Sequence, residues 1–106
     1  MNISNSVFSD NSADFGGGIL GNDGNDSELI VIDSMFANNT AVYNGGGISQ
    51  NTGTIIVANS VFLNNSSQQV GGGIYMNADS SLYISDSIFS NNTAVNHGGG
   101  VIATGL

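Results

Sequence analysis

Apolar and polar residues alternate along this chain in a pattern that occurs four times. Phe recurs every 26 to 28 residues, at Phe8, Phe36, Phe62 and Phe89, and a triple Gly starts eight or nine residues after each of them. Within each repeat the apolar positions are two residues apart, which is the period of a β-strand and not of a helix. Such self-similarity predicts a solenoid built from one coil per repeat.

Equivalent positions in the repeats carry similar residues, and these columns predict a core of stacked ladders. Besides the Phe column, they are Leu29, Ile55 and Leu82; Ile3, Val31, Val57 and Ile84; Ser6, Ser34, Ser60 and Ser87; and Ile19, Ile48, Ile74 and Val101. Three short strands per coil, separated by Gly and Asn turns, fit this repeat length. We therefore expect a single all-β domain over residues 1–106, a right-handed parallel β-helix of four coils, with repeats at approximately 1–28, 29–54, 55–81 and 82–106.

Asn and Gly mark the expected turns. Asn11, Asn39, Asn65 and Asn92 form an invariant column, and Asn both tolerates a left-handed conformation and hydrogen-bonds to its equivalent in the next coil. A Gly-rich phosphate loop would need a following helix and usually a Lys, and this chain offers neither. The triple Gly segments are thus expected where the backbone bends sharply or lies against its neighbour.

Composition narrows the possible functions. The chain has no Lys or Arg and a formal charge of −8, so it lacks the cations that bind nucleic-acid phosphates or anionic lipid. It has no Cys and no apolar run long enough to span a bilayer, and its first residues lack the basic and apolar stretches from which we would expect a signal peptide. We expect no nucleic-acid partner and no direct membrane insertion. The chain is then either a piece of a longer protein or one whose export signal has been removed.

The alternation of Phe-x-x-Asn with Gly-Gly-Gly-Ile or Gly-Gly-Gly-Val, four times over, resembles the repeat of the polymorphic outer membrane proteins. Their tandem signatures are Phe-x-x-Asn and Gly-Gly-Ala-Ile/Leu/Val, so this chain differs by having Gly in place of Ala. The resemblance covers essentially the whole chain. It implies a surface-exposed β-helical passenger with adhesive function, although the C-terminal β-barrel anchor of such proteins is missing from this sequence.

One segment suggests a cation site. Residues 21–29 resemble a single calcium-binding nonapeptide, in which Asp23, Asp26 and Glu28 would supply oxygen ligands. Those nonapeptides bind calcium between successive copies, and only one copy occurs here. The alternative is a longer polar turn in the first coil, and no other cofactor is expected.

Two Asp residues suggest a glycan-cleaving enzyme. Asp33 and Asp86 share a column with Asn5 and Asn59, so they should project from one side at roughly 9–10 Å, the upper limit for an inverting glycosidase. Lyases on this fold typically use a cationic residue, which is missing, and Asp–Asn interchange also fits a turn. The single His, His97, has no acid nearby in sequence and is expected to be a surface turn residue. We expect no catalytic residues and no enzymatic activity.

The outward positions of the first strand form an apolar stripe. Ile30, Ile32, Ile56, Ala58 and Tyr83 should face solvent, which is unusual for an exposed sheet. β-branched residues favour strands in any case, but a packing or partner surface is the interpretation we prefer.

Three functions remain. The first is a structural or binding module of a cell-surface β-helical protein, an adhesin or passenger stalk with a host or cell-surface ligand. The second is an extracellular filament subunit that stacks head to tail, because the terminal repeats lack the polar caps of most solenoids. In a longer parent protein, neighbouring coils would cover the same edges. The third is the glycan-active enzyme.

Overall fold

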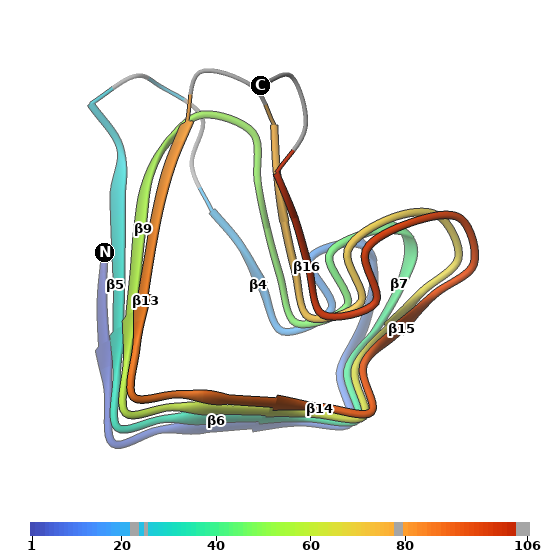
Figure 1. The fold of residues 1–106 in the computed structure, drawn as a ribbon, viewed down its shortest axis with the longest axis horizontal. Coiled ribbons are helices and arrows are strands. Elements are labelled where there is room, and N and C mark those ends of the chain that lie inside the picture. The colour runs from blue at the N-terminus through green and yellow to red at the C-terminus, as the bar shows by residue number, and fades with distance from the viewer. Residues whose placement is uncertain (22–23, 25, 78–79, 104–106) are drawn as a thin grey trace.

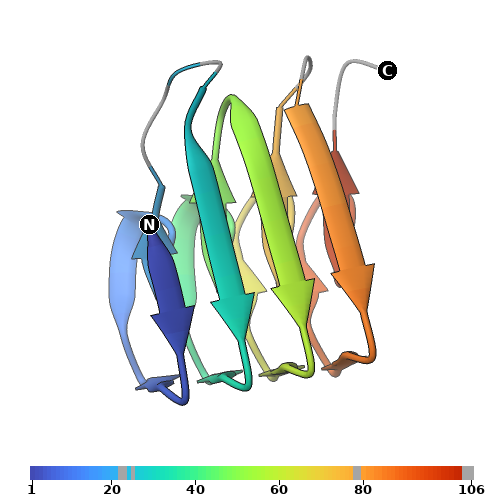
Figure 2. The same ribbon diagram turned by 90° about the vertical axis from the view of Figure 1, so that its left-hand side faces the viewer.

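The computed structural model describes residues 1–21, 24, 26–77 and 80–103, and these residues form four parallel sheets with one strand from each coil. Figure 1 shows the coils superposed, and Figure 2 shows the strands β1, β5, β9 and β13 side by side. The chain completes three full turns from β1 to β13 and then forms the last coil. The predicted all-β parallel β-helix is confirmed. No helix among the described residues is long and apolar enough to cross a bilayer.

The sheets are numbered 1 to 4 in the order in which the chain enters them. Sheet 1 contains β1 (Asn2–Ser4), β5 (Glu28–Ile32), β9 (Gly53–Ala58) and β13 (Ser80–Ser85). Sheet 2 contains β2 (Val7–Ser9), β6 (Met35–Ala37), β10 (Val61–Leu63) and β14 (Ile88–Ser90). Sheet 3 contains β3 (Ser12–Phe15), β7 (Thr40–Asn44), β11 (Ser66–Ser67) and β15 (Thr93–Ala94). Sheet 4 contains β4 (Ile19–Leu20), β8 (Ile48–Gln50), β12 (Ile74–Met76) and β16 (Val101–Ala103).

The expectation of three strands per coil is wrong, because the polar stretch after each Asn forms a fourth strand. The residues that this sheet 3 turns inward are small, namely Ala13, Ala41, Ser67 and Ala94. Ala41 and Ser67 are buried without adding a large apolar side chain to the core. A strand with so little apolar volume has no clear hydrophobic signal in the sequence.

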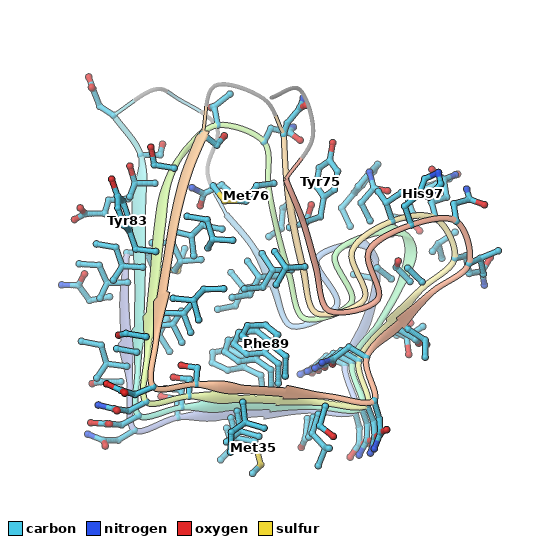
Figure 3. All side chains as sticks on the ribbon, viewed as in Figure 1. Met35, Tyr75, Met76, Tyr83, Phe89 and His97 are labelled. Atoms are coloured by element: carbon cyan, nitrogen blue, oxygen red, sulfur yellow. The ribbon has the colours of Figure 1, made fainter. Side chains whose placement is uncertain are left out.

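The Phe ladder forms the centre of the core. The rings of Phe8, Phe36, Phe62 and Phe89 stack with centroids 4.6–4.8 Å apart and planes within 7° of each other. Phe36 and Phe62, in the middle coils, are fully buried, and Figure 3 shows the stack ending at Phe89 inside the coil. Aliphatic ladders from sheets 1 and 4 surround it. The separation of the rings matches the spacing of adjacent strands, so the sheet register places ring on ring.

Replacing Phe62 with Ala is expected to lower the free energy of unfolding by about 3–5 kcal/mol, because it opens a cavity between two stacked rings. Phe8 is only partly buried at the edge of the ladder, so Phe8→Ala should cost clearly less. Urea unfolding followed by circular dichroism measures both changes. Equal costs at the two positions would contradict the ladder.

The Asn column forms a hydrogen-bonded ladder along the solenoid. The Asn39 backbone N–H and Nδ2 both donate to Asn65 Oδ1, at 3.0 and 2.9 Å, and the other Nδ2 hydrogen goes to Phe8 O at 2.9 Å. Asn65 repeats this pattern toward Asn92 and Phe36. The predicted ladder is therefore present, and it satisfies polar groups inside the coil.

The left-handed conformation was expected at this Asn column, but it occurs one residue earlier. Asp10, Asn38, Asn64 and Asn91 have φ between 56° and 59°. The ladder residue itself keeps an ordinary backbone and turns its side chain inward. The two neighbouring residues therefore have different roles. The exposed residue makes the bend, and the buried residue forms hydrogen bonds to the next coil.

A second polar ladder lies at the start of sheet 2. Ser34 and Ser60 are buried, and each hydroxyl donates to a carbonyl two residues earlier while it accepts the N–H of the equivalent Ser in the preceding coil. Like the Asn ladder, the Ser column therefore satisfies buried polar groups by hydrogen bonds between successive coils.

The triple Gly segments serve both expected purposes. The first Gly of each has φ between 62° and 71°, a conformation that favours Gly. The second lies against the neighbouring backbone: a Cβ on Gly46 would lie 2.6 Å from Ser66 N and would overlap the carbonyl oxygens of Ser66 and Gly72. The prediction of a bend with close backbone approach is confirmed.

Asn44, at the end of β7, has a buried Oδ1 without a hydrogen-bond partner. Its neighbour in the next coil is Val70. Asn44→Val should therefore raise the free energy of unfolding by about 1 kcal/mol, because it removes an unsatisfied acceptor. Thermal unfolding checks this, with Asn44→Asp, which should be less stable than the parent chain, as the control. A lower melting temperature for Asn44→Val would contradict the assignment.

Candidate binding surface

The corner between sheets 1 and 2 is made by the column that contains Asp33 and Asp86. Asn5, Asp33, Asn59 and Asp86 are exposed and have φ between 49° and 52°. Asn and Asp are the side chains that tolerate this conformation. The backbone N–H groups of Asn5, Asp33 and Asn59 each donate to a carbonyl of the next coil. The turn therefore accounts for the alternation of Asn and Asp in this column.

Asp33 and Asp86 do lie on one side of the solenoid, in the second and fourth coils, as predicted. Both carboxylates are exposed, so they lack the burial with which enzymes adapt a carboxylic acid to proton transfer. His97 is exposed in the turn before sheet 4, where its backbone bridges to Val70, and Figure 3 shows it on another side of the coil. The structure brings together no acid–base pair from these three residues.

A shallow groove of about 520 Å³ runs beside this corner over the first three coils. Its polar wall consists of the corner side chains and the Ser residues that follow, namely Asn5, Ser6, Asp33, Ser34 and Asn59. Its apolar wall consists of Val7, Met35 and Val61, the first residues of three sheet 2 strands. Because neither wall includes a cationic side chain, the carboxylate of Asp33 gives the groove a negative charge.

The predicted stripe on sheet 1 is in register on the outer face. Ile30, Ile56 and Tyr83 are Cα partners on successive strands, and Ile32 pairs with Ala58. Tyr83 is 61% exposed and Ile32 is 37% exposed. The first row begins with Asn2, and the second is bounded by Ser4 and Ser85. The second row of the stripe therefore ends in polar residues on both sides, whereas the first row continues to Tyr83 on the last coil.

A longer apolar row, which was not predicted from the sequence, lies on sheet 2. Val7, Met35, Val61 and Ile88 are in register on all four coils, next to the groove. Val7 is 68% exposed and Ile88 is 60% exposed, and Figure 3 shows Met35 pointing outward. Each of these residues directly precedes a Phe of the core. Alternation around the Phe was the signal that could have revealed this face.

A pair of stacked aromatic residues on sheet 3 was also missed. The rings of Phe15 and Tyr43 lie 5.1 Å apart, and both side chains are substantially exposed. A register shift between Ala13 and Phe15 pairs Phe15 with Asn44 along the backbone. The first coil is one residue shorter between its Asn and its triple Gly, so counting back from the Gly pairs Phe15 with Asn44. Counting forward from Asn11 and Asn39 aligns Phe15 with Tyr43, and this was the signal in the sequence.

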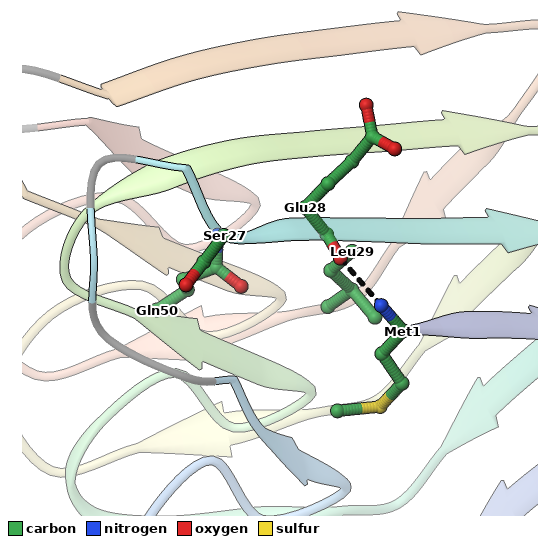
Figure 4. A pocket seen from close by; sticks show the side chains of 5 residues that line it. All are labelled: Met1, Ser27, Glu28, Leu29 and Gln50. Atoms are coloured by element: carbon green, nitrogen blue, oxygen red, sulfur yellow. Dashed lines mark hydrogen bonds between the residues drawn. The ribbon is translucent and has the colours of Figure 1, made fainter.

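The proposed calcium ligands are only partly described. Asp23 lies outside the described residues, while Asp26 and Glu28 are exposed. A pocket of about 160 Å³ lies nearby, lined by Met1, Ser27, Glu28, Leu29 and Gln50. Figure 4 shows the Glu28 carboxylate pointing away from Gln50 and Met1. In the described part of the chain no three acidic, His or Cys side chains are grouped to hold a metal ion, and calcium binding by this segment stays a prediction.

All the described acidic side chains are exposed, namely Asp10, Asp14, Asp26, Glu28, Asp33 and Asp86. The surface is consequently anionic without any Lys or Arg to compensate. Exposed carboxylates remain hydrated, so folding requires no paired cation. The electrostatic field of this surface therefore attracts cations.

Three segments of the chain match a family of known proteins. The sequence model of the Chlamydia polymorphic membrane protein repeat matches residues 33–51, 59–77 and 86–105. Each match runs from the corner between sheets 1 and 2, through the Phe and Asn ladders, to the strand after the triple Gly. The comparisons with curated proteins and with solved structures each give no match. Since the three segments together cover more than half of the chain, the chain belongs to the Chlamydia polymorphic membrane protein repeat family.

Proposed function

We propose that this chain is a non-enzymatic structural and binding module of a cell-surface β-helical protein, displayed outside the cell in association with the outer membrane. The observation that carries the proposal is the stacking of family repeats into a solenoid with apolar rows on its outer faces. Monomeric soluble proteins rarely expose long apolar patches unless the patches bind something. A host or cell-surface ligand is the partner that such an adhesin or passenger stalk would contact.

Adhesion of chain-coated beads to cultured host cells tests the proposal. Beads with the parent chain are expected to adhere. The double variant Ile30→Thr, Ile56→Thr should adhere less, because it removes the apolar stripe while keeping β-branched side chains in the strands. The double variant Thr40→Ser, Thr93→Ser on sheet 3 is a matched control. It leaves the sheet 1 stripe unchanged, so beads that carry it should adhere like beads with the parent chain. No adhesion above uncoated beads would contradict the proposal.

A filament subunit is the second candidate, favoured by the polarity of the ladders. Within the described residues, Asn11 Oδ1 accepts no bond at one end, and Asn92 N donates none at the other. The Ser ladder has the same polarity, because the Ser6 hydroxyl oxygen at one end could accept the Ser87 N–H at the other end of a second copy. The ring of Phe8 could likewise stack on the ring of Phe89. A second copy stacked head to tail would continue all three ladders, as unpaired strand edges permit.

Sedimentation velocity and electron microscopy over a concentration series test the stacking. Each copy carries a charge of −8, so stacking should increase with ionic strength, as screening weakens the repulsion between copies. Filaments are expected to lengthen with both concentration and salt. A monodisperse monomer under all conditions would exclude the filament and leave the adhesion module unaffected.

A further inference from the structure

We propose that the groove between sheets 1 and 2 binds a basic, extended peptide segment of a partner protein. This inference deepens the proposed binding function by assigning the face and the chemistry of the ligand. It concerns the groove beside the sheet 2 row, and not the sheet 1 stripe used in the adhesion experiment.

The shape of the face fits an extended chain. The row Val7, Met35, Val61 and Ile88 continues over all four coils without interruption. Three strand spacings separate its ends, so it is about 14 Å long. An extended peptide of four to five residues covers that length, and its apolar side chains would pack on the row.

The corner column supplies the polar contacts. The side chains of Asn5, Asp33, Asn59 and Asp86 make no hydrogen bond within the described residues, because the turn uses only their backbone. Asn59 lies between the two carboxylates and offers an amide group to a peptide backbone. The column therefore presents carboxylate, amide and carboxylate in successive coils, beside an apolar row.

Charge complementarity selects the ligand. Asp33 and Asp86 have no Lys or Arg of this chain to pair with. A second copy carries the same charge of −8 and offers no cation either, so it is a poor occupant of this face. Anionic lipid and nucleic acid are repelled for the same reason. A segment with Lys or Arg both neutralises the carboxylates and buries apolar side chains.

The spacing of the carboxylates specifies the segment further. Asp33 lines the groove, and Asp86 continues the same column on the fourth coil, beyond the end of the groove. The two residues are two coils apart, about 9–10 Å. In a polyproline II conformation, residues three positions apart project in the same direction and are separated by about 9 Å. Two basic residues three positions apart in an extended segment thus match the two carboxylates.

The test uses a synthetic extended peptide with two Arg three positions apart and Pro and Val between and around them. Isothermal titration calorimetry should show saturable binding that weakens with salt. The double variant Asp33→Asn, Asp86→Asn should weaken binding at least about fivefold, because two exposed ion pairs are lost. Asn already occupies the same column in the other two coils, so the substitution should preserve the turn. Met35→Thr should also weaken binding, through the apolar row.

The control removes the same net charge elsewhere. Asp10→Asn, Asp14→Asn leaves the groove intact, and Asn is the native residue of the Asp10 column in the other coils. Its affinity should equal that of the parent chain. Equal losses in both double variants, binding of a peptide with Gln in place of Arg, or no binding would overturn the proposal. Self-association that Met35→Thr abolishes would assign the face to a second copy and overturn it as well. Cell adhesion that persists without peptide binding would leave the proposed function standing.

Discussion

Replacing Asn65 with Ala is expected to lower the free energy of unfolding by about 4–6 kcal/mol. Asn65 is completely buried. Its Oδ1 accepts two hydrogen bonds from Asn39, and its Nδ2 donates to Phe36 O and Asn92 Oδ1, both at 2.9 Å. Ala removes all four bonds and leaves buried groups of two neighbouring coils without partners.

Urea unfolding measured by circular dichroism checks this value. Asn11→Ala is the matched control, because Asn11 is exposed at the end of the ladder and its side chain makes one hydrogen bond, from Nδ2 to Asn39 Oδ1. It should cost about 1–2 kcal/mol. Equal stability of the two variants would contradict the prediction that the buried hydrogen bonds of Asn65 stabilise the fold.

The ladders also explain how much of the fold could be predicted from the sequence. Stacking places each residue on its equivalent one coil away, so the columns of Phe, Ser and Asn are directly visible as repeats. Sheet 3 was not visible, because its inward residues are small and its outward residues are mixed, as Asp14 and Val42 illustrate. A strand whose burial contributes little apolar surface is specified by its neighbours and not by its own pattern.

The position of the left-handed residue shows a different limit. In three coils the ladder Asn is preceded by another Asn, so composition cannot distinguish the residue that bends from the residue that bonds. Only the first coil has Asp10 followed by Asn11. Hydrogen bonding requires the amide at Asn11, Asn39, Asn65 and Asn92, whereas the bend accepts Asp or Asn. That difference could have assigned the two roles.

The apolar rows on the outer faces were predictable only in part. The sheet 1 stripe was expected from alternation, and it is in register. The sheet 2 row was not predicted, although Val7 and its equivalents directly precede the inward-facing Phe and therefore face outward. Outward residues need not repeat for the solenoid to form, so Tyr83 and Asn2 occupy the same row. The outer faces are consequently formed by the least regular positions, and the repeat pattern alone does not predict their chemistry.

Replacing Gly46 with Ala should have the largest effect of any methyl-sized change in this chain. The new Cβ would overlap backbone atoms of Ser66 and Gly72 in the next coil, with Ser66 N at 2.6 Å. Backbone atoms in a ladder cannot move aside as a flexible side chain can, so the coils must separate. The cost should approach the whole stability of a domain of this size, about 5–15 kcal/mol. We expect circular dichroism to show loss of the cooperative unfolding transition.

Two glycines of the last coil serve as controls for Gly46→Ala. A Cβ on Gly99 would lie 2.6 Å from Asn92 O of its own coil, whereas a Cβ on Gly100 meets no atom within 4 Å. Gly99→Ala should therefore be clearly destabilising, and Gly100→Ala should change stability by less than about 0.5 kcal/mol. Because both residues lie in the same coil, the difference between the two variants measures the cost of steric overlap, apart from the effect that any Gly→Ala change has on stability. A cooperative transition for Gly46→Ala close to that of the parent chain would mean that the coils are not in backbone contact at the triple Gly segments, and the stacked solenoid would have to be abandoned.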